Sequence, residues 1–311
     1  MSKQKIRLIF MGTPDFSVPS LQALIKENGF EIVAVVTQAD KAVGRGHIMS
    51  APPIKQIASK NGLTVLQPLK IKEITSTVKE LKPDLIIVAA YGKIIPLEIL
   101  EIPVYGCLNV HASLLPKYRG AACLNAPILN GDSKTGITIM KMEEGLDTGP
   151  ILRQAEITLN GDETLEFVHD KLSLLGAEIL PTTIKDWLNG KIKEREQKET
   201  DASYVKMIKK EDGHINWQNK AEEIERLIRA YNPWPGTYSF KEKELIKIIS
   251  VDKTPLKINN YKIGEIFFDN GKMAIQCGQD ALLILKLQTA GKKIMTSSEF
   301  LRGHKLSGIL K

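Results

Sequence analysis

The first half of the chain alternates short apolar runs with amphipathic stretches, and this alternation most narrows the folds open to it. The apolar runs occupy residues 6–11, 32–36, 63–66 and 85–90, and stretches with helical spacing separate them. Runs that are apolar at consecutive positions predict strands buried on both faces. Repeated strand–helix–strand units with right-handed crossovers therefore predict a parallel sheet covered by helices. Ligands of such sheets bind beyond the carboxyl ends of the strands.

The pattern changes in the last third of the chain. A long amphipathic helix is expected from Thr164, and the run 190–199 has few apolar residues and mixed charge, which is typical of a linker. Beyond a helix near 221–230, alternating runs and turn signals favour a small antiparallel barrel, with strands expected at 245–251, 264–268, 273–276 and 282–287. We therefore expect an α/β domain at 1–189, a linker at 190–207 and a barrel domain at 208–311.

Composition limits the classes of protein that fit. The 311 residues, 43% hydrophobic and 25% charged, suit two ordinary globular domains. No apolar run approaches the roughly 20 residues that span a bilayer. The apolar run near the N-terminus is too short for a secretory signal, so a cytoplasmic protein is expected. Three widely spaced cysteines without a CxxC pair predict buried thiols, and neither disulfides nor a zinc site.

Positive charge is concentrated in the predicted barrel. Residues 208–311 contain 18 Lys and Arg against 12 Asp and Glu, a net charge of +6 out of +7 for the whole chain. A basic domain favours anionic partners and is typical of nucleic-acid binding, although many basic surfaces are only solvated.

The strand-like segment 106–111 runs into a proline-containing loop and carries the chemistry. Asn109 and His111 are two residues apart, so on a strand their side chains share a face. Acyl transfer needs preorganised donors for a developing oxyanion, and an imidazole can move protons near neutral pH. An isolated Asn-x-His more often has a structural role, with the amide holding the loop and the histidine partly buried.

Two further segments favour the catalytic interpretation. The loop Ser113, Leu114, Leu115 and Pro116 is apolar where a polar loop is usual, which suits a pocket for a heterocyclic ligand. Asp147, after an expected strand at 137–142, is predicted to return to the same sheet edge and orient His111. A turn or capping role before Gly149-Pro150 is the alternative for this carboxylate.

Other chemistries find no motif. The chain has no GxSxG elbow, no HExxH and no metal-ligand spacing, so covalent and metal catalysis are disfavoured. The glycine-containing loops at 12–15 and 38–50 match neither a dinucleotide nor a Walker pattern. Arg45, between two glycines, is either a phosphate-binding finger or a solvated loop tip, and from the residues alone the solvated tip is favoured.

The segments 109–122 and 136–149 resemble the signature of the folate-dependent formyltransferases. The segments 12–16, 232–237 and 299–304 are similar to the members of that family that act on methionyl-tRNA, and the likeness covers essentially the whole chain. The resemblance implies a Rossmann-like catalytic domain joined to an OB-fold-like barrel. It also implies 10-formyltetrahydrofolate as donor, no metal, and the methionine amine of initiator methionyl-tRNA as acceptor.

The resemblance also implies roles for individual residues. Asn109, His111 and Asp147 match the catalytic trio of the family. Tetrahydrofolate contacts are expected from Ser113 to Pro116, with Ile94 and Ile95 flanking the pterin, and Arg45 is expected to face the tRNA acceptor end. The chain departs from the family pattern at Ala39, His47 and 123–125, which affects the acceptor loop and the pocket wall.

Three alternatives stay open at this point. A formyltransferase acting on an amino-sugar nucleotide would share the trio and need no basic barrel, and a formyltetrahydrofolate hydrolase would share the donor site. A non-catalytic nucleic-acid-binding protein would need no intact trio. The absence of a leftover apolar stripe favours a monomer.

Overall fold

A computed structural model describes residues 5–43, 48–303 and 307–311. The chain forms two compact units. The first contains Met1–Cys123, Thr135–Ile157 and His169–Val205, and the second contains Leu124–Lys134, Thr158–Val168 and Lys206–Lys311. The boundaries predicted at 189 and 207 stay a prediction.

The first unit is built on a seven-stranded sheet in the order β10-β9-β7-β6-β1-β2-β5. Three of the four apolar runs form the central strands β6, β1 and β2, and the fourth forms the edge strand β5. Strands β1, β2, β5, β6 and β7 pair in parallel, as predicted. Strand β9 differs because it is antiparallel to β7, with Lys141 opposite Leu108. The strands are β1 (Ile6–Gly12), β2 (Phe30–Val36), β5 (Val65–Leu66), β6 (Leu85–Ala89), β7 (Cys107–His111), β9 (Lys134–Lys141) and β10 (Ile151–Thr158).

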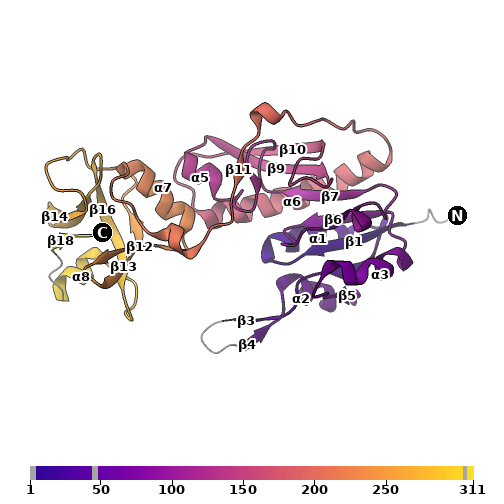
Figure 1. The fold of residues 1–311 in the computed structure, drawn as a ribbon, viewed down its shortest axis with the longest axis horizontal. Helices are drawn as coiled ribbons and strands as arrows, with labels where there is room; N and C mark the ends of the chain where they lie inside the picture. Colours follow the sequence, from indigo (N-terminus) through magenta and orange to yellow (C-terminus); the bar gives the residue numbers. More distant parts are fainter. Residues whose placement is uncertain (1–4, 44–47, 304–306) are drawn as a thin grey trace. The chain divides into compact units, whose positions relative to one another are not determined.

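Helices pack on this sheet, and a short hairpin extends away from it (Figure 1). The helices expected after the first strands are present, and Leu21, Leu24 and Val78 are buried in the core. The hairpin pairs β3 (Lys41–Val43) with β4 (Ile48–Ser50). The helices are α1 (Val18–Lys26), α2 (Pro53–Lys60), α3 (Thr75–Glu80), α4 (Leu97–Leu100) and α6 (Leu165–Leu188), whose first residues belong to the second unit.

The second unit contains a curled antiparallel sheet in the order β12-β13-β16-β15-β14-β18, with β17 also paired to β16. Register shifts between β13 and β16 bend the sheet, as bulges do. The predicted turn at 269–271 joins β14 to β15, with Asn270 and Gly271 at φ +47° and +74°. The strands are β12 (Thr237–Lys241), β13 (Glu244–Val251), β14 (Glu265–Asp269), β15 (Lys272–Gln276), β16 (Ala281–Thr289), β17 (Met295–Thr296) and β18 (Gly308–Ile309).

The core of the second unit lies between this sheet and helix α7 (Ala221–Tyr231). Alternate strand residues such as Ile246, Ile248 and Ile284 point inward and pack with Ile224 and Ile228 of the helix. The unit also includes α5 (Ala126–Asn130) and α8 (Ser297–Gly303). The predicted fold class, a parallel α/β domain followed by a barrel-like antiparallel sheet, is confirmed. In the described ranges, every helix is too short or too polar to cross a bilayer.

Candidate active site

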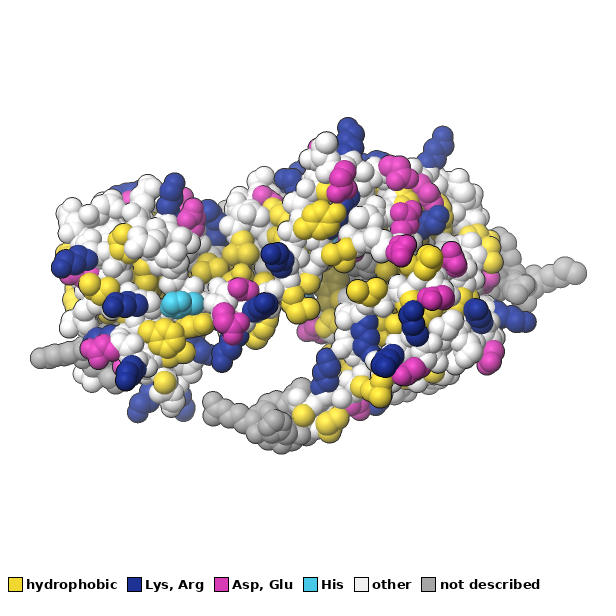
Figure 2. All heavy atoms as spheres, in the orientation of Figure 1, with side chains coloured by type: hydrophobic (Ala, Val, Ile, Leu, Met, Phe, Trp, Pro, Cys, Tyr) yellow, Lys and Arg dark blue, Asp and Glu magenta, His cyan; other side chains and the backbone are white. Residues whose placement is uncertain are grey.

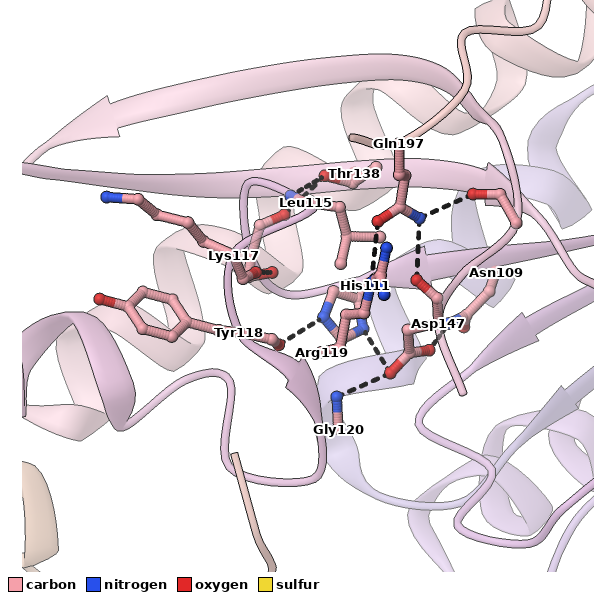
Figure 3. A network of polar contacts seen from close by, with 12 residues as sticks. Asn109, His111, Leu115, Lys117, Tyr118, Arg119, Gly120, Thr138, Asp147 and Gln197 are labelled. Carbon is pink, nitrogen blue, oxygen red and sulfur yellow. Dashed lines mark hydrogen bonds and ion pairs between the residues drawn. The ribbon is translucent and has the colours of Figure 1, made fainter. Parts of the chain in front are cut away.

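Asn109 and His111 lie at the end of β7, whose parallel neighbour is β6. Val88 of β6 is opposite Asn109, so both side chains lie toward the carboxyl ends of the central strands. Asn109 is half-buried, whereas His111 is buried. The two side chains converge on one carboxylate, that of Asp147 (Figure 3). Asn109 and His111, two residues apart on a strand, thus direct their side chains to the same face.

Asp147 reaches this position from the loop between β9 and β10. Because β9 runs antiparallel to β7, it ends beside the start of β7, and the loop must return along the sheet to bring Asp147 to the site. Asp147 Oδ1 accepts from Asn109 Nδ2 at 3.4 Å, and Oδ2 accepts from the Gly120 backbone N–H at 2.8 Å. The turn or capping role does not describe this carboxylate, since its partners are distant in sequence.

Gly120 is required where it stands. Its φ is +106°, and a Cβ there would lie 2.5 Å from the carbonyl oxygen of Val205. Strand β8 (Arg119–Gly120) pairs in parallel with β11 (Tyr204–Val205), which creates this close approach. A side chain would separate the two strands and move the N–H that holds Asp147.

Both ring nitrogens of His111 face acceptors. Nε2 lies 3.0 Å from the carbonyl oxygen of Tyr118, which can only accept, so Nε2 carries a hydrogen. Nδ1 lies 3.7 Å from Asp147 Oδ2. Nδ1 is therefore the ring nitrogen that faces the carboxylate.

Hydrogen bonds between hydroxyl side chains and the loop backbone anchor the apolar loop after His111. Ser113 is fully buried, and its hydroxyl donates to the carbonyl of Lys117 at 2.6 Å. The backbone N–H of Leu115 donates to Thr138 Oγ1 at 3.0 Å, and the Leu115 side chain packs with two residues of the strands beside it. Leu114 and Pro116 are partly exposed. Folate contacts from this loop stay a prediction.

Ile94 and Ile95 differ in their surroundings. Ile94 is 88% exposed, on the loop that follows β6. Ile95 is buried in the core with Tyr91 and Ile99. Of this predicted pair, Ile94 is therefore the one whose side chain is available to a ligand. Arg45 and His47 lie outside the described residues.

Two contributors to the site were not singled out from the sequence. Gln197, in the run predicted as a linker, donates to the backbone of the Asp147 loop, and buried Arg119 contacts Gln197. Burial alone would lower the pKa of Arg119, but hydrogen bonds to Glu199 and Tyr204 outweigh it and raise that pKa. Arg119 lies in the segment 109–122 that carries the family resemblance, but no local sequence pattern predicts that an arginine will be buried.

The thiol on strand β7 does not provide a nucleophile. Cys107 lies on β7, two residues before Asn109, and burial raises its pKa to about 12. The thiolate is the reactive form, so this group stays protonated at neutral pH. Cys277 is likewise buried with a pKa of about 12, whereas Cys123 is partly exposed, contrary to the expectation that all three are buried. In the part of the chain that is described, no cluster of three or more His, Cys, Asp or Glu could hold a metal ion.

The sequence matches the family described as "Formyl transferase" over residues 4–184 and "Formyl transferase, C-terminal domain" over residues 207–305. The chain belongs to the formyl transferase family. Methionyl-tRNA formyltransferase of Caldanaerobacter subterraneus subsp. tengcongensis is 46% identical over 304 residues, which cover 97% of this chain and 98% of that protein. The protein of the same name from Thermodesulfovibrio yellowstonii is 46% identical over 302 residues, which cover 96% of each chain.

Solved structures share the fold of this formyl transferase. An N-formyltransferase from Helicobacter canadensis, in complex with folinic acid and dTDP-3-aminofucose, has a TM-score of 0.68 at 23% identity. The match covers 91% of this chain and 99% of that one. HypX from Aquifex aeolicus in complex with tetrahydrofolic acid has a TM-score of 0.63 at 16% identity, covering 96% of this chain and 47% of that one. The predicted family is confirmed.

Proposed function

We propose that this protein transfers the formyl group of 10-formyltetrahydrofolate to the amino group of methionine on initiator methionyl-tRNA, a step of translation initiation. The near-complete alignment with two methionyl-tRNA formyltransferases at 46% identity carries this proposal. The convergence of Asn109 and His111 on Asp147 supports it with a site suited to acyl transfer. We also propose that the protein is cytoplasmic and acts as a monomer.

The residues around the trio suit a folate. Exposed Ile94 follows the strand beside Asn109, and Leu146, 60% exposed, precedes Asp147, so apolar side chains border a polar centre. A heterocycle with an apolar face and polar edges matches this combination.

The bound cosubstrate supplies an activated formyl group, and the residues of the chain provide the rest. The Asn109 amide has two N–H groups, of which one at most is directed at Asp147, so the other can donate to the oxygen that gains negative charge. Protonated His111 keeps a positive charge beside that oxygen. Asp147 holds His111 and accepts a proton from the ammonium that forms when the amine attacks the formyl carbon. That proton is passed on to the folate nitrogen as the bond between this nitrogen and the formyl carbon breaks. An amine acceptor needs no nucleophilic residue, which agrees with the protonated Cys107.

The second unit supplies positive charge for the tRNA. Lys and Arg side chains are spread over its face in Figure 2 and are mixed with acidic ones. Its net charge from residue 208 onward is +6. Contacts of lysine and arginine with phosphates position a nucleic acid without reading its sequence. The barrel is therefore proposed to orient the tRNA, while the first unit performs the chemistry.

An acceptor assay tests the proposed function. The purified protein is incubated with formyl-labelled 10-formyltetrahydrofolate and, in parallel, with initiator methionyl-tRNA, a dTDP-amino sugar, or no acceptor. We expect label on the tRNA alone. Label on the sugar would support the amino-sugar alternative, release of formate without an acceptor would indicate a hydrolase, and binding of tRNA without label would indicate a non-catalytic protein.

Arg45→Ala is expected to weaken productive tRNA engagement. The substitution removes a positive charge from the segment of the sequence between β3 and β4. A phosphate contact made by a lysine or arginine contributes a salt-dependent part of the affinity. We expect KM for methionyl-tRNA to rise and its dependence on salt concentration to become less steep, with KM for the folate unchanged. Unchanged kinetics with tRNA at every salt concentration would assign Arg45 to a solvated loop tip.

A further inference from the structure

The segment 194–205 forms part of the candidate active site, although its sequence is typical of a linker. We propose that Gln197, held by Arg119, is a positioning residue for Asp147, an inference that rests on the proposed function. The contacts of the Gln197 amide, the burial of Arg119 and the anchoring of the backbone on both sides carry it.

The Gln197 amide holds the loop that presents Asp147. Its Nε2 donates to the carbonyl oxygens of Asp147 at 2.8 Å and of Gly149 at 2.7 Å, so both amide hydrogens are used on one loop (Figure 3). Asp147 has a φ of +53°, a backbone conformation that residues other than glycine seldom adopt. Such a conformation persists only where the surroundings fix it. Gln197 holds the backbone of this residue from outside the loop, while Gly120 and Asn109 hold its side chain.

Arg119 determines which way the Gln197 amide faces. Its Nε donates to Gln197 Oε1 at 3.1 Å, and a guanidinium has no acceptor, so the oxygen must point to Arg119 and the nitrogen to the loop. Arg119 is 1% exposed and is itself fixed, because Nη1 donates to Glu199 at 2.7 Å and to the Tyr204 hydroxyl at 2.6 Å. The amide orientation is therefore specified by a buried charge.

The backbone on either side of Gln197 is also anchored. Before it, Arg195 forms an isolated bridge with Ile151, through hydrogen bonds of 2.8 and 3.0 Å. After it, the backbone N–H of Arg119 donates to the carbonyl of Ser203 at 2.8 Å, where β11 begins to pair with β8. Gln197 thus spans two fixed points, and its side chain has little room to take another position.

A purely structural role for Gln197 has to be separated from positioning. Gln197 could serve only as an acceptor for the buried Arg119 guanidinium. Gln197→Glu separates the two roles, because glutamate keeps and strengthens the acceptor for Arg119 but loses both hydrogens that hold the Asp147 loop. Its carboxylate also repels the carbonyl oxygens of Asp147 and Gly149.

For Gln197→Glu, we expect kcat for formylation to fall by about 10- to 100-fold, as small misplacements of a reacting group do. KM for methionyl-tRNA and for the folate should stay within about threefold. The thermal unfolding midpoint should change little, because the new ion pair with Arg119 offsets the hydrogen bonds lost to the loop. Gln22→Glu, at an exposed position on α1, is the matched control and should leave all three unchanged. A purely structural role predicts full activity in Gln197→Glu.

The outcomes distinguish this inference from the function on which it rests. Normal kcat in Gln197→Glu together with an inactive Asp147→Asn would overturn the positioning role alone. Normal kcat in Asp147→Asn would overturn the proposed site itself. If Gln197→Glu does not fold, Gln197→Asn keeps the amide but is one methylene shorter, and a reduced kcat with unchanged KM values in that variant supports positioning, whereas normal kcat overturns it.

Discussion

Replacing Asn109 with alanine is expected to lower kcat for formylation by about 100-fold or more, with little change in tRNA binding. Removing one donor to a developing oxyanion typically costs 10²- to 10³-fold in rate. The Asn109 side chain donates to Asp147 at a long 3.4 Å, so the loss of this weak hydrogen bond should cost little stability. Single-turnover formylation at saturating methionyl-tRNA measures the chemical step, and a filter-binding titration measures the affinity for tRNA.

A second asparagine provides the control for this experiment. Asn189 is exposed near the end of α6, and its amide donates to the Lys185 carbonyl at 2.7 Å. Asn189→Ala removes a side-chain amide of the same kind away from the trio, and its single-turnover rate should match the parent protein. If Asn109→Ala turned over at the parent rate, the oxyanion role would be wrong and His111 would have to supply that donor alone.

The apolar pattern predicted the fold well where burial alone decides the structure. Consecutive apolar residues at 85–90 correspond to β6. The turn signal at 269–271 joins two strands, and the positive φ values of this turn suit Asn270 and Gly271. The pairing of β8 with β11 was not predictable, because each strand has two residues and they lie 85 positions apart. Strands this short carry no periodic signal, so only the folded chain shows them.

The candidate site was predicted where local geometry determines the neighbours. The spacing of Asn109 and His111 requires a shared face on any strand. Gln197 lies in a charged run without apolar periodicity, and nothing local connects it to a loop 50 residues earlier. Ile94 and Ile95 are adjacent, and sequence alone could not tell that the first faces outward while the second packs in the core. These features were not predicted because they depend on contacts between segments that are distant in sequence.

Asp147→Asn is expected to lower kcat by about 10²- to 10⁴-fold, the range for a group that accepts or donates a proton in the transition state. The amide cannot accept the proton, and it also mismatches its neighbours. If its oxygen accepts from the Gly120 N–H, as Oδ2 does now, its nitrogen faces the donating amide of Asn109. The imidazolium of His111 then loses its counter-charge, so both members of the trio are disturbed.

The rate is measured by rapid-quench formylation across a range of pH, with thermal unfolding to confirm that the variant folds. Asp170→Asn, an exposed substitution on α6, is the control and should keep the parent rate. A kcat within threefold of the parent in Asp147→Asn would mean that the carboxylate neither accepts a proton nor supports His111. Because Asn109 and His111 converge on this one side chain, its removal should cost more than the loss of the Asn109 amide alone. The order of the two effects is therefore a test of the arrangement itself.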